Sequence, residues 1–330
     1  MTMPDHLDAD RWSAPGGEPV LVVDAARWTR PEASIQTVVI GVDREGALPA
    51  VAVDDFDLLL TLAKDPPRPW VQLDPREVDA QVERLAAAAR ANPLAATIAA
   101  QVLRTTENLP LSDALTVESF AYSTLLGGAE FARWRGKAEV GDAAPTPPEP
   151  VQVRRDEKGL MLTLNHPENF NAMTAAMRDA LYEALANALD DPSAPAVLLH
   201  GVGRCFSTGG DLPEFGTARD LAEAHAVRTL HSCARLLRAL GDRATVRLHG
   251  ACLGSGIEVA AAAHHRIAAA DAWFQLPELG MGLIPGAGGT ATVARAIGRH
   301  RTLWMLLSGK RVGAAQALDW GLVHKIEGGA

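Results

Sequence analysis

Two glutamates and two glycine-rich turns lie close together in one stretch of the chain, residues 249–290. Glu258 follows a turn at 254–256, and Glu278 precedes a second turn at 286–288. Two carboxyl groups that face one cavity can divide acid and base work between them. A glycine-rich turn that opens a helix can aim backbone N–H groups at a developing negative charge. The stretch therefore predicts an active site.

A third glycine-rich loop, RCFSTGGDL at 204–212, follows an apolar run that is typical of a strand. Each feature also has a structural explanation when it is taken alone. Paired glycines often mark only a turn that needs positive φ, and a glutamate in the first turn of a helix complements the helix dipole. The interpretation as a site rests on their combination.

Two other motifs fit less well. Ser255 lies in LGSGI, which lacks the first glycine of the G-x-S-x-G nucleophile turn because position 253 is leucine. Gly286, Gly288 and Ala291 match the spacing of a dinucleotide-binding loop. That loop should follow a strand directly and be followed by an acidic residue about 20 positions later. Here Pro285 precedes it, and no acid follows before Asp319.

The elements expected to hold these loops follow residue 150. Two short strands surround a turn at 157–159, and an amphipathic helix starts near Thr174. A buried strand at 195–203 leads into the first loop, a helix covers roughly 218–240, and a strand leads into 249–290. Because strand, glycine-rich loop and helix recur in this order, we predict a coiled succession of ββα turns.

The first 150 residues have a different pattern. We expect a flexible arm at 1–18 and a small α/β segment at 19–73, with strands at 19–26, 37–43, 47–53 and 69–73 and a helix at 53–62. A helical segment follows at 74–137, with caps at Asp74 and Ser112. Four prolines in 138–150 indicate a linker and the main domain boundary before a core at 151–330.

Composition excludes several classes of protein. The 330 residues have a formal net charge of −9, which argues against a general nucleic-acid binder. Three cysteines without CxxC spacing indicate neither a disulfide framework nor a zinc site. No apolar segment resembles a secretory signal or a membrane span. We expect a soluble, cytoplasmic protein.

Several segments, in order, resemble the crotonase superfamily, the enoyl-CoA hydratase/isomerase family. They are NHPENFNAM, LLHGVGRCFSTGGDL, HGACLGSGIEVAAA, FQLPELGMGLIPGAGGT and LLSGKRVGAAQALDWGLVHKI, and together they cover about residues 151–327. The resemblance implies an α/β fold with a crotonase-like spiral core. It also implies an acyl-CoA substrate, with coenzyme A as part of that substrate, no metal or redox cofactor, and a homo-oligomer, either a trimer or a dimer of trimers.

The same resemblance assigns roles to individual residues. The backbone N–H groups of Gly210 and Ser255 would form an oxyanion hole, although the second position is usually glycine in the family. Glu258 and Glu278 would be the two catalytic glutamates, with Glu278 as the acid that protonates C2. Further substrate- or CoA-binding positions would be Ser207, Gly209, Asp211, Leu212, Gly254, Pro277 and Gly286.

Retention of both glutamates favours enoyl-CoA hydratase, an enzyme of fatty acid metabolism that adds water across the C2=C3 bond. Another acyl-CoA reaction of the family is the nearest alternative: isomerisation, thioester hydrolysis or decarboxylation. A non-catalytic CoA-binding or assembly protein is an alternative of a different class.

The helical segment before the linker resembles the C-terminal helices of the family, and residues 91–137 carry that resemblance. We therefore expect a rearranged crotonase in which these helices precede the core and pack against it. Residues 19–73 would be a degenerate, inactive copy of part of the core, since LLLTLAKDPPRPWVQL parallels LLRALGDRATVRLHG.

Overall fold

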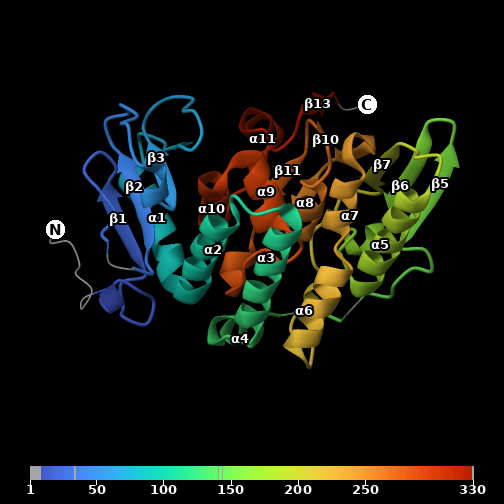
Figure 1. Ribbon diagram of the computed structural model, residues 1–330, viewed down its shortest axis with the longest axis horizontal. Coiled ribbons are helices and arrows are strands. Elements are labelled where there is room, and N and C mark those ends of the chain that lie inside the picture. Colours follow the sequence, from blue (N-terminus) through green and yellow to red (C-terminus); the bar gives the residue numbers. More distant parts are fainter. Residues whose placement is uncertain (1–8, 33–34, 140, 143, 329–330) are drawn as a thin grey trace.

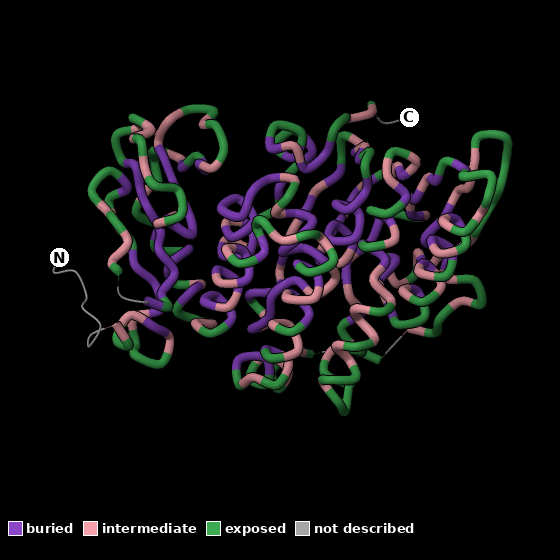
Figure 2. The backbone as a smooth tube through the Cα atoms, in the orientation of Figure 1, coloured by how far each residue is buried: buried purple, intermediate pink, exposed green. Residues whose placement is uncertain are grey.

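The computed structural model describes residues 9–32, 35–139, 141–142 and 144–328. These residues form a mixed α/β structure with sheets of four, six and three strands. Figure 1 shows the N-terminal sheet at one end, helices in the middle and the β5–β6 hairpin at the other end. Buried residues continue from that sheet through the central helices (Figure 2). Within the described ranges, no helix is both long and apolar enough to cross a membrane.

The N-terminal sheet is parallel throughout, and its strands lie side by side in chain order. They are β1 (Val20–Asp24), β2 (Val38–Asp43), β3 (Leu58–Thr61) and β4 (Val71–Gln72). Strands predicted at 19–26, 37–43 and 69–73 are thus confirmed.

The helix predicted at 53–62 is wrong, since a short 3-10 turn (Val53–Asp55) precedes β3 there. Leu58 and Leu60 belong to the main core, whereas Leu59 packs in a second cluster on the other face of the sheet. A strand buried on both faces reads as an unbroken apolar run, which has no period to distinguish it from a helix. The strand predicted at 47–53 is also wrong, because 47–52 contains neither helix nor strand.

Residues 9–18 are folded, although we expected them to be part of a flexible arm. A 3-10 turn (Ala9–Arg11) opens this segment, and the N–H of Gln36 donates to the carbonyl of Trp12 at 3.0 Å. Residues 1–8 of the predicted arm lie outside the described residues. The described part of the predicted linker, 138–150, contains no helix or strand.

A helical block follows the N-terminal sheet, in agreement with the sequence. It contains α1 (Val78–Ala91), α2 (Pro93–Thr106), α3 (Leu111–Leu126) and α4 (Ala129–Arg135). The predicted caps are wrong: Glu77 is the N-cap of α1 and Pro110 that of α3. Both α2 and α3 pack against α9, and α3 also packs against α6. The block therefore lies on the core, as the rearranged arrangement requires.

The core is built around a six-stranded sheet of order β13-β10-β8-β7-β6-β5, parallel except for the β5–β6 hairpin. Its strands are β5 (Val151–Asp156), β6 (Gly159–Leu164), β7 (Val197–Gly201), β8 (Ala244–Leu248), β10 (His265–Ala269) and β13 (Lys325–Glu327). A smaller sheet contains β9 (Ala251–Leu253), β11 (Trp273–Gln275) and β12 (Val312–Gly313).

Helices alternate with these strands. They are α5 (Ala175–Asp190), α6 (Leu221–Leu230), α7 (Cys233–Ala239), α8 (Ser255–Ala260), α9 (Gly289–Ile297), α10 (Arg299–Ser308) and α11 (Ala314–Trp320). Chain order β8, β9, α8 is followed by β10, β11, α9, so each turn gives one strand to each sheet and then a helix. The predicted spiral of ββα turns is confirmed.

The single helix predicted at 218–240 is divided into α6 and α7. The chain bends at His231 and Ser232, and the Ser232 hydroxyl accepts a hydrogen bond from the N–H of Arg235 as the N-cap of α7. A capping serine inside an apparently continuous helical pattern is a signal of such a break.

The local likeness behind the degenerate-copy idea does not extend to the structure. Residues 58–61 form a strand, while their counterparts at 236–239 belong to α7. In addition, no α-helix separates the strands of the N-terminal sheet in the described residues. The wider idea that 19–73 derives from a core copy stays a prediction.

Candidate active site

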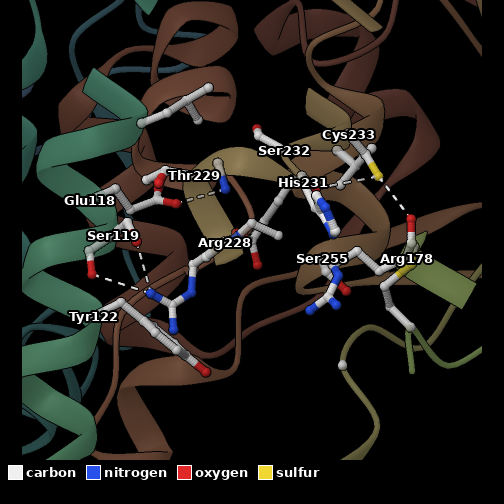
Figure 3. A pocket seen from close by; sticks show the side chains of 18 of the residues that line it. Glu118, Ser119, Tyr122, Arg178, Arg228, Thr229, His231, Ser232, Cys233 and Ser255 are labelled. Carbon is white, nitrogen blue, oxygen red and sulfur yellow. Dashed lines mark hydrogen bonds between the residues drawn. The ribbon is translucent and has the colours of Figure 1, made fainter. Parts of the chain in front are cut away.

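A cavity of about 270 Å³ is lined by residues of α3, α6 and α8 and by the glycine-rich loops. Five of the predicted site residues line it: Gly210, Ser255, Glu258, Glu278 and Gly286. Figure 3 shows that side chains of α3, on the N-terminal side of the linker, face the cavity together with those of the core. The structure therefore brings the predicted glycine-rich loops and both glutamates together around one cavity.

Backbone pairing brings the first two loops together. The N–H of Leu253 donates to the carbonyl of Ser207 at 3.0 Å, and the N–H of Ser207 donates to that of Ala251 at 3.2 Å. Gly209 has a φ of +88°, and a Cβ there would lie 2.8 Å from the Leu253 carbonyl oxygen. Only glycine suits both the conformation and the close approach.

The amides of Gly210 and Ser255 are available to a ligand. In the part of the chain that the structure describes, neither N–H donates to a protein acceptor. Ser255 is the first residue of α8, so its N–H is one of those that a helix leaves without an internal partner. Its hydroxyl is buried and also has no partner among the described residues.

The remaining predicted positions do not line the cavity. The hydroxyl of Ser207 donates to the Asn171 carbonyl at 2.7 Å and accepts from the N–H of Gly209 at 3.2 Å. Asp211 accepts from Asn169 at 3.0 Å, which leaves Oδ2 buried without a described partner. The side chain of the next residue, Leu212, is exposed.

Gly254 and Pro277 shape the approach to the glutamates. Gly254 is the N-cap of α8 and has a φ of +45°, and a Cβ there would lie 2.7 Å from Oε1 of Glu278. Pro277 is the residue before the 3-10 turn (Glu278–Met281) that carries Glu278. These two positions therefore support the carboxyl groups and do not themselves line the cavity.

Glu258 lies in the first turn of α8 and is buried. Its Oε2 accepts hydrogen bonds from the N–H groups of Ala287 at 2.7 Å and Gly289 at 3.0 Å. Burial raises the pKa of Glu258 to about 6, and the two amides oppose this rise because they stabilise the carboxylate. Glu258 is thus held mostly as an ion near neutral pH.

Glu278 is equally buried but is less well supplied with donors. Its Oε2 has no hydrogen-bond partner among the described residues. Burial, followed by the charge of Glu258, raises the pKa of Glu278 well above the usual range of a carboxyl group. The two glutamates therefore differ in protonation, which is what a pair that divides acid and base work requires.

A third carboxyl group, Glu118 of α3, lines the same cavity, and the sequence analysis missed it. It accepts hydrogen bonds from the N–H groups of Gly288 and Thr290, each at 2.7 Å, and from the Thr290 hydroxyl at 2.6 Å. Burial, and then the nearby Glu258, raises the pKa of Glu118 to about 8. Four successive amides, 287–290, are thus divided between Glu258 and Glu118.

The pattern of α3 contained a signal for Glu118. Leu115, Glu118, Ser119 and Tyr122 are spaced three, one and three residues apart, so all lie on one face of the helix. A charged residue on the apolar face of a helix is rare unless it has a partner.

The hydrogen bonds that Glu258 and Glu118 accept from the amides of 287–290 also exclude the dinucleotide-loop interpretation of 286–291. These amides bind the protein's own carboxyl groups.

Comparison with known proteins shows the family of the chain. Residues 155–328, more than half of the chain, match the family model for enoyl-CoA hydratase/isomerase. The chain belongs to this family. All four predicted catalytic and oxyanion residues lie inside the matched range of the enoyl-CoA hydratase/isomerase model, whereas Glu118 lies outside it.

Individual relatives cover only part of this chain. A "probable enoyl-CoA hydratase" of Bacillus subtilis (strain 168) is 33% identical over 174 residues, which are 52% of this chain and 67% of that protein. The fatty acid oxidation complex subunit alpha of Shewanella sp. (strain W3-18-1) is 35% identical over 179 residues, 53% of this chain and 25% of that protein.

A solved structure extends the likeness to the fold. The crystal structure of a "putative enoyl-CoA hydratase" from Rhodopseudomonas palustris CGA009 has a TM-score of 0.51 and 32% identity, and it covers 57% of this chain and 72% of that one. The crotonase fold of the core is therefore supported by sequence and by structure.

Proposed function

We propose that this family member is an enoyl-CoA hydratase. One cavity supports this most. In it, the backbone N–H groups of Gly210 and Ser255, which donate to no acceptor among the described residues, accompany two buried carboxyl groups that differ in protonation. Hydration needs these parts: a place for oxyanion charge, a base for water and an acid for carbon.

In the proposed reaction the thioester oxygen accepts hydrogen bonds from the amides of Gly210 and Ser255. Electron density moves onto that oxygen when water adds to C3. Oxyanion-hole donors of this kind contribute roughly 3 kcal/mol each to transition-state stabilisation. Because both amides are fixed by the loop pairing around Ser207, they need no reorganisation during the reaction.

Proton transfer is assigned from the environments of the glutamates. Glu258, the more readily ionised carboxylate, takes a proton from the attacking water. Glu278, kept protonated by burial and by the charge of Glu258, gives its proton to C2. The proton then passes from Glu258 back to Glu278, and the product carries one added water. No metal or redox cofactor takes part in this proposal.

The reaction class is tested by the mass of the product. Crotonyl-CoA should gain one water and keep its thioester, whereas hydrolysis would release free coenzyme A. Isomerisation is tested with a 3-enoyl-CoA, whose double bond would move without a change in mass, and decarboxylation with a malonyl-type thioester, which would lose carbon dioxide. Recovery of every thioester unchanged would favour a non-catalytic CoA-binding or assembly protein.

Other properties stay proposals. Assembly as a trimer or a dimer of trimers, a cytoplasmic location, and contacts of CoA with Asp211, Leu212 and their neighbours are expected from the family resemblance.

A further inference from the structure

Arg228 is a charged group of the cavity that the proposed hydration does not use. It lies on α6 and lines the same cavity as Gly210, Glu258 and Glu278. Figure 3 shows its guanidinium group between α6 and α3, close to Ser119 and Tyr122. Desolvation lowers the pKa of Arg228, in accordance with a position that is partly shielded from water.

The guanidinium is held in place, but its charge is not neutralised. Nη1 donates to the hydroxyls of Ser119 at 2.8 Å and Ser123 at 3.1 Å, and the group stacks over the Tyr122 ring, 4.6 Å from the ring centroid. Within the described residues, Nε and Nη2 donate to no protein atom, and no carboxylate oxygen lies within 4.0 Å.

Within the described residues, the carboxylates of the cavity do not supply that partner. The other arginines of the cavity differ from Arg228, since Arg235 is exposed and donates through Nη2 to the Leu230 carbonyl at 2.9 Å. Arg178 also lines the cavity, but it is paired with Asp179 at 2.8 Å. Both oxygens of Glu118 are occupied by the amides of Gly288 and Thr290. Arg228 therefore presents two unused donor groups on a fixed plane, the arrangement that binds a carboxylate through two parallel hydrogen bonds.

The position of Arg228 relative to the reacting carbons decides which anion it meets. Tyr122, on which Arg228 stacks, packs directly on Gly286: a Cβ there would lie 2.7 Å from the tyrosine ring. The amide of Ala287, the next residue, holds Glu258. Only one aromatic ring thus separates Arg228 from the loop whose amides hold the base, Glu258 of α8. The phosphates of CoA lie at the far end of the pantetheine arm, so an anion this close belongs to the acyl group.

We propose that Arg228 binds a carboxylate at the distal end of the acyl chain, so that the preferred substrates are short enoyl-CoA thioesters of dicarboxylic acids. The reaction in this inference rests on the proposed function, whereas the binding preference for a distal carboxylate does not. Tyr122 and the two serines act as the support that keeps the guanidinium plane in one orientation.

Binding of two saturated thioesters tests the inference without any turnover. Glutaryl-CoA and pentanoyl-CoA have acyl chains of equal carbon number, and neither has a double bond to hydrate. Titration calorimetry on the intact protein should give a Kd at least tenfold lower for glutaryl-CoA. Arg228→Gln should remove this difference, and Arg228→Lys, which keeps the charge but not the planar fork, should keep part of it. Arg238→Gln, an exposed arginine of α7 outside the cavity, should keep all of it.

Several results would overturn the inference. Equal affinity of the wild-type protein for both thioesters does so even if Arg228→Gln does not fold. An unchanged preference in a folded Arg228→Gln protein also does so. Equal weakening of both thioesters would mean that Arg228 contacts a phosphate of CoA or only joins α6 to α3. Failure of enoyl-CoA hydration, in contrast, would refute the proposed function and leave a measured binding preference standing.

Discussion

Glu258 and Glu278 share one cavity, yet their oxygens meet different donors. Two loop amides hold Oε2 of Glu258, whereas Oε2 of Glu278 has no described partner. Donors to a carboxylate favour its ionised form, and burial without donors favours the neutral acid. The division into base and acid therefore follows from local hydrogen bonding, although both residues are glutamates.

This difference predicts the pH dependence of kcat/KM. The base works when ionised, so activity should rise as pH increases through about 6, the value to which burial raises the pKa of Glu258. The acid works when protonated, so activity should fall only at alkaline pH, because the pKa of Glu278 is raised well above its usual range. Initial rates of hydration across the pH range test this, with apparent values that belong to the coupled pair. Activity that declines between pH 6 and neutrality would contradict it.

At the scale of elements, α3 and the start of α9 form one unit with the catalytic loop. Amides 287 and 289 hold Glu258, and amides 288 and 290 hold Glu118. The N-terminus of α9 carries a partial positive charge that suits both carboxylates. Glu118 thereby fixes, from outside the matched family region, the loop on which the base depends.

Glu118→Gln should therefore shift the pH profile. Above about pH 8, the value to which burial raises the pKa of Glu118, its carboxylate carries a negative charge that contributes to the raised pKa of Glu278. A neutral amide removes that charge, so the alkaline limb should move to lower pH. The side-chain NH2 of glutamine would also face an amide N–H, so kcat should fall. Glu130→Gln is the matched control: Glu130 is buried and caps α2 through the amides of Leu94 and Ala95, away from the cavity lining. If both variants keep the wild-type profile, Glu118 has only a structural role.

Local chemistry explains which elements were predictable. The glycine-rich loops and the flanking strands could be predicted because positive φ and close backbone approach require glycine at positions such as 209 and 254. The strand at 58–61 could not, because three consecutive leucines satisfy a helix and a doubly buried strand equally. Glu118 was missed for another reason: its partners lie some 170 residues away in sequence, and a pattern within one helix does not name them.

At the scale of the molecule, one side chain joins the N-terminal sheet and helical block to the core. Arg299 of α10 is only 3% exposed and donates to the carbonyls of Phe56 at 2.7 Å and Val53 at 3.1 Å, and to Glu107 at 2.9 Å. The main hydrophobic cluster likewise includes residues from β2, α2 and the core strands. We expect the two parts to unfold together because they share this interior.

Arg299→Met should destabilise the fold. Removing the guanidinium leaves the buried Phe56 carbonyl without its donor, at a cost of about 2 kcal/mol or more in the free energy of unfolding. Urea titration measures this change. Arg11→Gln, which breaks an exposed ion pair with Glu18, is the control and should cost less than about 0.5 kcal/mol. Equal unfolding midpoints for Arg299→Met and the wild type would show that the contact carries no stability.

The most direct measurement is the rate of crotonyl-CoA hydration by the wild-type protein and by Glu258→Gln and Glu278→Gln, followed as loss of the conjugated thioester absorbance. Each substitution should lower kcat by roughly 10²-fold or more while KM changes little, because each glutamate acts on protons in the transition state. The double variant should be little slower than the slower single variant, and well short of the product of the two single effects, since the pair works as a unit. Wild-type kcat in either folded single variant would contradict the two-glutamate mechanism.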